Sequence, residues 1–214
     1  INLPEPEETG TTFIENAELK ARLAAKLSGL PAIADDSGLC ISALGGAPGI
    51  YSARWAGENK NFNAAMERVA DALLMSGQYD RKASFHCALS FGWPDGKNES
   101  VEGVLTGQII WPARGNKGFG YDPMFVPDGY TETFGEMEPN KKHAISHRAV
   151  AYDKLIKKCF QKITPKQNKL GVYVHWPYCE SKCPYCDFNS HVEKDIDVEQ
   201  WEFAYLSELR WMAD

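Results

Sequence analysis

Residues 30–39 read Leu-Pro-Ala-Ile-Ala-Asp-Asp-Ser-Gly-Leu, an apolar run that ends on two adjacent carboxylates. The apolar part predicts a short buried strand over residues 30–34. Two carboxylates at the end of a buried strand repel each other and lose solvation, so they need a compensating charge. If the strand continues through Asp35 and Asp36, their side chains point to opposite faces and only one can serve a given site. A turn formed by Asp-Asp-Ser-Gly explains the same residues equally well.

Helical and strand patterns alternate around this stretch. A helix is predicted upstream over residues 11–29, because Thr12 and Glu15 form a capping box, alanines supply an apolar stripe and Gly29 can end the helix. Downstream, the pattern predicts a glycine-rich loop at 43–57, a helix at 60–76, a strand at 84–91, one or two strands over 99–111, a glycine-rich loop at 115–120 and a helix over 146–160. This order predicts an α/β domain.

The composition is that of a globular protein. The chain has 214 residues, of which 43% are hydrophobic and 24% are charged, and this length allows one substantial core or two modest ones. A net charge of −6 and a pI near 5.4 argue against a nucleic-acid partner, because phosphate binding depends on clustered Lys and Arg. No apolar run approaches the roughly 18 residues of a membrane span, so we expect no membrane partner.

The first residues and the cysteines indicate the compartment. The chain begins Ile1-Asn-Leu-Pro, without the basic flank and apolar stretch of a signal peptide. The chain has six cysteines, three of them clustered, and we interpret them as reduced thiols of a cytoplasmic protein. The opening segment reads like the middle of a domain and does not start with Met, so we expect a truncated N-terminus.

The candidate chemical groups also have plain structural explanations. A divalent cation would relieve the repulsion between Asp35 and Asp36, and Mg²⁺ favours carboxylate oxygens. However, the capping box explains Glu15, a helix N-terminus explains Ser146-His147-Arg148, and packing within a strand explains His86. The residues alone leave these alternatives open.

Five motifs occur in a fixed order through the first part of the chain. They are Thr11-Thr-Phe-Ile-Glu-Asn-Ala17 with Lys20-Ala21, Ala34-Asp-Asp-Ser-Gly-Leu39, Leu44-Gly-Gly-Ala-Pro-Gly-Ile-Tyr-Ser-Ala-Arg54, Gly118-Phe-Gly-Tyr-Asp-Pro123 and Lys142-His-Ala-Ile-Ser-His-Arg148. Together they resemble the inosine/xanthosine triphosphate pyrophosphatases over about residues 1–160. The resemblance implies a mixed twisted sheet with flanking helices and two lobes around a cleft. We also expect a homodimer, because a missing first strand would leave apolar sheet surface uncovered. It also implies hydrolysis of ITP, dITP and XTP to the monophosphate and pyrophosphate, which cleanses the nucleotide pool.

The same resemblance implies roles for individual residues. Glu15 and Asp36 would hold Mg²⁺, and Asp36 would also activate the attacking water. The substrate contacts would come from Ser37, Phe119, Gly120, Tyr121, Asp122, Lys142, His147 and Arg148. An arginine donor suits the 6-keto group of inosine and xanthosine and rejects the amino group of adenine, because two donors would face each other. The family's phosphate-binding loop, which precedes the Glu15 position, is missing here, so we expect impaired activity.

A cysteine cluster follows a polar linker at residues 161–169. Cys179, Cys183 and Cys186 have the spacing C-x3-C-x2-C, which supplies three ligands to a 4Fe–4S cluster and leaves one iron open. The segment over 170–214 resembles the start of the radical S-adenosylmethionine enzymes of the oxygen-independent coproporphyrinogen-III-oxidase-like type. That resemblance implies a 4Fe–4S cluster and S-adenosylmethionine as further cofactors.

The C-terminal segment is too short for radical catalysis. A strand at 170–175, the cysteine loop and a helix at 197–212 make only a strand–loop–helix fragment of a radical enzyme barrel. A zinc knuckle with His175 or His191 as fourth ligand is the alternative for the cysteines. For the whole chain, the alternatives to a pyrophosphatase are an iron–sulfur module with the first domain as scaffold, and a non-functional junction of two reading frames.

Overall fold

The computed structural model describes residues 4, 6–160, 178–179 and 191–192. The chain forms two compact units, Ile1–Thr164 and Pro165–Asp214. In the second unit, β5 (Tyr178–Cys179) and β6 (His191–Val192) form a parallel pair. Several predictions fall outside the described residues: the linker at 161–169, the strand at 170–175, Cys183, Cys186 and the helix at 197–212.

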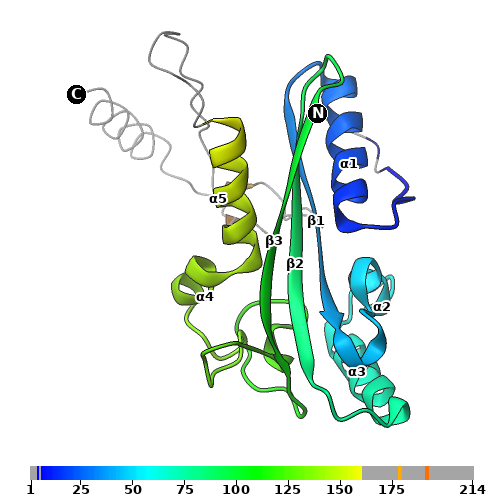
Figure 1. Ribbon diagram of the computed structural model, residues 1–214, viewed down its shortest axis with the longest axis vertical. Coiled ribbons are helices and arrows are strands. Elements are labelled where there is room, and N and C mark those ends of the chain that lie inside the picture. The colour runs from blue at the N-terminus through cyan, green and yellow to red at the C-terminus, as the bar shows by residue number, and fades with distance from the viewer. Residues whose placement is uncertain (1–3, 5, 161–177, 180–190, 193–214) are drawn as a thin grey trace, which may run out of the picture. The chain divides into compact units, whose positions relative to one another are not determined.

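A four-stranded sheet forms the centre of the first unit (Figure 1). Its strands pair in the order β1-β2-β3-β4, and all three pairs are antiparallel. The strands are β1 (Ala32–Ile41), β2 (Lys82–Gly92), β3 (Asn98–Ile109) and β4 (Phe125–Pro127). The expected mixed sheet is therefore wrong for the described part of this unit. The physical reason is visible at β2 and β3, since a tight turn at Trp93–Lys97 joins them and such a turn connects only antiparallel strands.

The first strand is longer than its apolar run predicted. The prediction ended it before Asp35, and the alternative was a turn over residues 35–38. In the structure the strand continues through both carboxylates, with Asp36 opposite Ala88 and Ser37 opposite Cys87. The alternative prediction of a turn over residues 35–38 is therefore wrong. Pairing with β2 holds these residues in an extended conformation although several of their side chains are polar.

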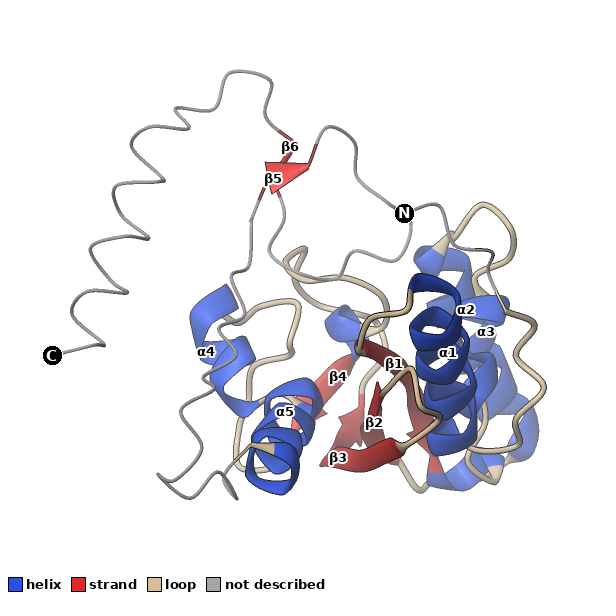
Figure 2. Ribbon diagram, turned by 90° about the horizontal axis from the view of Figure 1, so that it is seen from above, coloured by secondary structure: helices blue, strands red, loops and turns tan. Residues whose placement is uncertain are grey.

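Two helices cover opposite faces of the sheet, as Figure 2 shows. On one face lies α1 (Phe13–Ser28), which begins at the predicted capping box and ends at Gly29 in the left-handed conformation. On the other face lies α5 (His147–Cys159), whose N-cap hydroxyl, Ser146 Oγ, accepts from Ala149 N at 3.1 Å. Neighbouring residues of β2 separate the two packing layers: Ala88 packs with α1, and Cys87 packs with α5.

The close approach of α5 requires a glycine on β3. A Cβ at Gly103 would lie 2.1 Å from the carbonyl oxygen of His147 and 2.4 Å from Ala151 N. Only a residue without a side chain allows the helix to lie at this distance. The N-terminus of α5, which carries His147 and Arg148, is thereby held against the sheet.

The remaining elements surround the larger core. The helices are α2 (Ser52–Trp55), α3 (Phe62–Ser76) and α4 (Pro139–Ile145), and the 3-10 helices are η1 (Ser42–Leu44), η2 (Gly49–Tyr51) and η3 (Asp122–Met124). The helices predicted over 60–76 and 146–160 are thus confirmed as α3 and α5. The main core joins Val69 and Leu73 of α3 with Leu39 of β1 and with Phe125 and Phe134.

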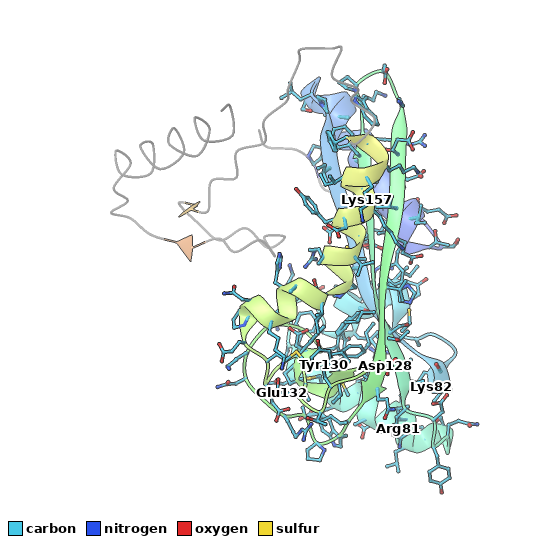
Figure 3. All side chains as sticks on the ribbon, turned by 60° about the vertical axis from the view of Figure 1, so that its left-hand side comes forward. Arg81, Lys82, Asp128, Tyr130, Glu132 and Lys157 are labelled. Carbon is cyan, nitrogen blue, oxygen red and sulfur yellow. The ribbon has the colours of Figure 1, made fainter. Side chains whose placement is uncertain are left out.

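Figure 3 labels Arg81 and Lys82 at the start of β2, and Asp128 and Tyr130 after β4. No described helix is both long and apolar enough to cross a membrane. The expected arrangement of two lobes around a cleft stays a prediction.

Candidate active site

The two neighbouring carboxylates of β1 lie on opposite faces of the sheet. Asp36 faces α1, where its Oδ1 lies 2.9 Å from Lys20 Nζ and its Oδ2 accepts from Asn16 Nδ2 at 3.3 Å. Asp35 faces α5, where its Oδ2 accepts from Arg148 Nη2 at 3.0 Å. The alternation of side chains along a strand therefore separates the pair, as the sequence predicted for a strand that continues through both.

Asp36 belongs to a buried cluster of charges. Its exposed fraction is 8%, and burial raises the pKa of its carboxyl although the Lys20 ammonium opposes that shift. For Lys20, burial acts to lower the pKa, but attraction by Asp36 and Glu8 outweighs it and raises the pKa overall. The Lys20 Nζ also lies 3.0 Å from Glu8 Oε1, and Glu8 Oε2 lies 3.4 Å from Arg54 Nη2. Two acidic and two basic side chains thus alternate through this cluster.

Glu15, the predicted partner of Asp36 in metal binding, caps the start of α1. Its Oε2 accepts from Thr11 N at 2.6 Å, from Thr11 Oγ1 at 2.8 Å and from Thr12 N at 3.2 Å. These hydrogen bonds lower the pKa of Glu15, which is exposed. The capping explanation of Glu15 is confirmed, and the acidic residue that shares Lys20 with Asp36 is Glu8. Glu8 lies in a coil before the helix, so no periodicity or cap in the sequence singled it out.

A metal centre is not assembled in advance in the described part of the chain. No group of three or more His, Cys, Asp or Glu side chains lies close enough there to hold an ion. The carboxylates of Asp36 and Glu8, which now bind the Lys20 ammonium, nevertheless supply oxygen donors of the kind that Mg²⁺ takes together with water and phosphate oxygens.

The α5 face of β1 brings Ser37 and Arg148 together. Ser37 Oγ donates to Asp35 Oδ2 at 3.1 Å, and the same oxygen atom accepts from Arg148. Cys87 lies beneath this group, and burial raises the pKa of its thiol to about 11, so it stays protonated at neutral pH. Asp35, which the sequence did not place in the site, therefore anchors two residues that it did.

His147 is buried in a neutral form. Its ring stacks on Phe85 at a centroid distance of 4.9 Å, and its exposed fraction is 6%. Burial, followed by the positive charges of Arg148 and Lys142, lowers the pKa of His147 to about 3. Its Nδ1 has no hydrogen-bond partner among the described residues. An unsatisfied buried nitrogen is unusual and indicates a place where a ligand can complete the bonding.

The loop over residues 118–122 presents an aromatic ring and a cation. Lys142 forms an ion pair with Asp122, and its Nζ lies 4.6 Å from the centre of the Phe119 ring. Phe119 is 48% exposed, so one face of its ring can contact a ligand. The loop is held by Asp122, whose Oδ2 accepts from Phe119 N at 2.7 Å.

Two predicted contact residues of this loop serve its structure. Tyr121 is buried, and its hydroxyl donates to the carbonyl oxygen of Ser52 at 2.8 Å. Burial raises the pKa of Tyr121 far above its usual value. Gly120 has a φ of 65°, in the left-handed region that favours glycine. Asp122 is buried as well, so Phe119 and Lys142 are the residues of this group that a ligand can reach.

The Ham1 family matches residues 1–158 of this chain. The protein belongs to the Ham1 family. The dITP/XTP pyrophosphatase of Rhodospirillum centenum is 59% identical over 161 residues, which covers 75% of this chain and 79% of that protein. The dITP/XTP pyrophosphatase of Ruegeria pomeroyi is 55% identical and covers 75% of this chain and 80% of its own.

Solved structures agree with this assignment. A HAM1 protein from Coxiella burnetii superposes with a TM-score of 0.70 at 45% identity, covering 73% of this chain and 80% of that one. A dITP/XTP pyrophosphatase from Mycobacterium abscessus superposes with a TM-score of 0.63 at 40% identity, covering 72% and 79%. The predicted α/β fold and the family resemblance of the first domain are confirmed.

Proposed function

We propose that this protein hydrolyses dITP, ITP and XTP to the monophosphate and pyrophosphate and so removes deaminated purine nucleotides from the pool. The proposal is supported by relatives of more than half-identical sequence that are dITP/XTP pyrophosphatases. The observation that carries it is the separation of Asp35 and Asp36 by β1. The face toward α1, the phosphate side, holds the groups for phosphate chemistry. The face toward α5, the base side, holds the groups for base recognition.

On the phosphate side, Asp36 and Glu8 are the residues that would hold Mg²⁺. Mg²⁺ held there would supply Lewis-acid stabilisation of the negative charge on the leaving pyrophosphate. Asp36 accepts the proton of the attacking water, because it is the more buried carboxylate and its charge is maintained by Lys20. Lys20 also has a second role. When Mg²⁺ takes its place between the two carboxylates, the Lys20 ammonium can bind the triphosphate. Glu15 is a weaker candidate for metal binding, because its carboxylate caps α1.

On the base side, Phe119, Lys142, His147 and Arg148 surround the purine. The Phe119 ring stacks on the base, and Lys142 and Arg148 donate hydrogen bonds to its keto groups. His147 stays neutral at physiological pH, so its open Nδ1 offers one further polar contact. Ser37 completes the site beside Asp35.

The test is a comparison of pyrophosphate release from ITP, XTP and ATP by the wild-type chain and by Arg148→Ala in the presence of Mg²⁺. We expect wild-type preference for ITP and XTP, and we expect the variant to lose about 1–3 kcal/mol of that preference, the scale of an unpaired buried polar group. A control variant, Glu132→Gln, removes an exposed carboxylate that pairs with Lys141 and should leave the preference unchanged. Equal hydrolysis of ATP and ITP by the wild type would contradict the proposed substrate class.

We also propose a cytoplasmic homodimer. Support comes from an exposed apolar surface at the end of α3, where Leu74 is 79%, Met75 87% and Tyr79 94% exposed. A cavity of about 300 Å³ next to this surface is lined by Asp71, Arg81 and Trp111 among others. Light scattering on the purified protein tests the dimer, and replacement of Leu74 and Tyr79 by Ser should shift it toward the monomer.

For the second unit, the cysteine spacing alone supports an iron–sulfur proposal. We propose that Cys179, Cys183 and Cys186 bind a 4Fe–4S cluster whose open iron can take S-adenosylmethionine. Anaerobic reconstitution of the full chain with iron and sulfide should give visible absorption that Cys183→Ser removes. Stoichiometric zinc without such absorption would instead support the zinc knuckle with His175 or His191.

A further inference from the structure

A second chain of polar side chains lies on the α1 face of the sheet. Ser84 and His86 alternate on β2, so their side chains share a face, and Glu102 lies on the neighbouring strand β3. Ser84 Oγ lies 2.9 Å from His86 Nε2, and His86 Nδ1 lies 2.9 Å from Glu102 Oε1. The hydrolysis described above uses none of these three residues.

The direction of these hydrogen bonds follows from the chemistry of the groups. An ionised carboxylate can only accept, so His86 Nδ1 carries the hydrogen and donates it to Glu102. In the tautomer with its hydrogen on Nδ1, the ring has a lone pair on Nε2, which accepts from the Ser84 hydroxyl. A hydroxyl bonded to a base that is itself oriented by a third group is the arrangement that activates serine nucleophiles.

Neighbouring elements hold this relay in place. The Phe13 ring at the start of α1 stacks on the His86 ring, with a centroid distance of 5.4 Å and an interplanar angle of 17°. On β3, the carbonyl oxygen of Glu102 accepts from Lys154 Nζ at 2.7 Å. Stacking by Phe13 and the pairing of β2 with β3 therefore restrict the His86 imidazole to the rotamer that reaches both Ser84 and Glu102.

Two of the three residues border a groove of about 660 Å³, within the range of small-molecule sites. His86 and Glu102 line it, together with Cys40, which lies opposite Ser84 in the pairing of β1 with β2. Apolar side chains such as Ile14 and Ile50 form much of its wall, and no Lys or Arg is among its lining residues. This lining suits a small uncharged ligand.

We propose that Ser84 is a nucleophile, with His86 as its general base and Glu102 as the orienting carboxylate, that accepts small uncharged acyl groups from activated esters. Ser84 Oγ forms a bond to the carbonyl carbon while its proton passes to His86 Nε2. The bond from that carbon to the leaving oxygen then breaks, and the leaving oxygen takes the proton from His86. Water reverses the sequence and releases the acid. Glu102 stabilises the charged imidazole in both halves.

The test uses the full chain and p-nitrophenyl acetate, with nitrophenolate release as the rate and peptide mass spectrometry as the readout of position. We expect one acetyl group on Ser84, and none there in Ser84→Ala. His86→Gln should slow the acetylation by about 10²–10⁴-fold, the usual contribution of a general base. Glu102→Gln should slow it less, because it orients the base without moving the proton.

Matched variants separate this reaction from background acetylation. Cys40→Ala should react like the wild type, because burial raises the pKa of the Cys40 thiol to about 11 and leaves it protonated. Ser84→Cys should stay reactive and carry the acetyl group as a thioester, which guards against loss of reactivity through misfolding. Pyrophosphate release from dITP should be the same in all these variants. Acetyl groups found only on lysines, or equal rates for wild type, Ser84→Ala and His86→Gln, would overturn the proposal.

Discussion

Asp35 and Asp36 are neighbours in the sequence but face different cations. Asp36 is paired with Lys20 at 2.9 Å, and Asp35 is paired with Arg148 at 3.0 Å. Each charge is compensated on its own face of β1, so the two carboxylates coexist without a shared ion. Substitutions of the two residues should therefore have separable effects on hydrolysis.

Asp36→Asn should lower kcat for ITP by about 10²–10⁴-fold, because it removes the general base. Asp35→Asn should instead weaken the hold on Arg148, so the preference for ITP over ATP should narrow while kcat changes less. Steady-state kinetics with both nucleotides measure the two effects. Equal losses of kcat with unchanged preference in both variants would contradict this division of roles.

Glu8 and Glu15 give a second residue-level prediction. Glu8→Gln should raise the Mg²⁺ concentration needed for half-maximal activity by about 10–100-fold, the scale seen when support of a metal site is lost. Glu15→Gln should leave this concentration unchanged, because Glu15 bonds to Thr11 and Thr12 at the start of α1. A magnesium titration of both variants decides between the two glutamates. If Glu15→Gln raised the required Mg²⁺ concentration and Glu8→Gln did not, Glu15 would be the ligand.

His147 predicts a pH dependence of stability. Its folded pKa is lowered to about 3 from 6.5, so the unfolded chain binds the proton first as the pH falls. The contribution of neutral His147 is fully present above pH 6.5 and is lost toward lower pH at up to about 1.4 kcal/mol per pH unit. Denaturant unfolding at several pH values above 5, where carboxylates interfere least, measures the slope. His147→Gln should flatten it, and an unchanged slope would mean that other groups cause it.

At the scale of elements, the position of α5 depends on one glycine of its supporting strand. Gly103→Ala would place a methyl group against the His147 carbonyl oxygen and Ala151 N. The free energy of unfolding should fall by about 1–3 kcal/mol, the range for overpacked sites. Val104→Ala on the same strand is the control, because its side chain is exposed. Base preference should also weaken in Gly103→Ala, since α5 carries His147 and Arg148; retention of both stability and preference would contradict the role of this contact.

At the scale of the whole molecule, the boundary between the two units lies after Thr164. The family match ends at residue 158, and every residue of the proposed nucleotide site lies before that point. A chain of residues 1–164 should therefore keep the kcat and KM of the full chain for ITP. Loss of activity in a truncated protein that still unfolds cooperatively would show that the second unit contributes to catalysis.

The sequence by itself determined the local elements and the family. The capping box of Thr12 and Glu15, the stop at Gly29 and the Ser146 cap were all predicted, and each was confirmed. These signals work because caps and periodicity act between residues a few positions apart. The five ordered motifs identified the family for the same reason, since each motif is a short continuous stretch.

The tertiary structure alone decided which side chains meet. It extended β1 through both carboxylates, directed Glu15 to its cap, brought Glu8 to Lys20 and joined Asp35 to Arg148, a residue 113 positions away. It also aligned Ser84, His86 and Glu102 through the register of β2 and β3. Strand register and helix docking set these contacts, and both depend on burial summed over the whole core. The sequence thus determined the elements, while packing determined the chemistry that they bring together.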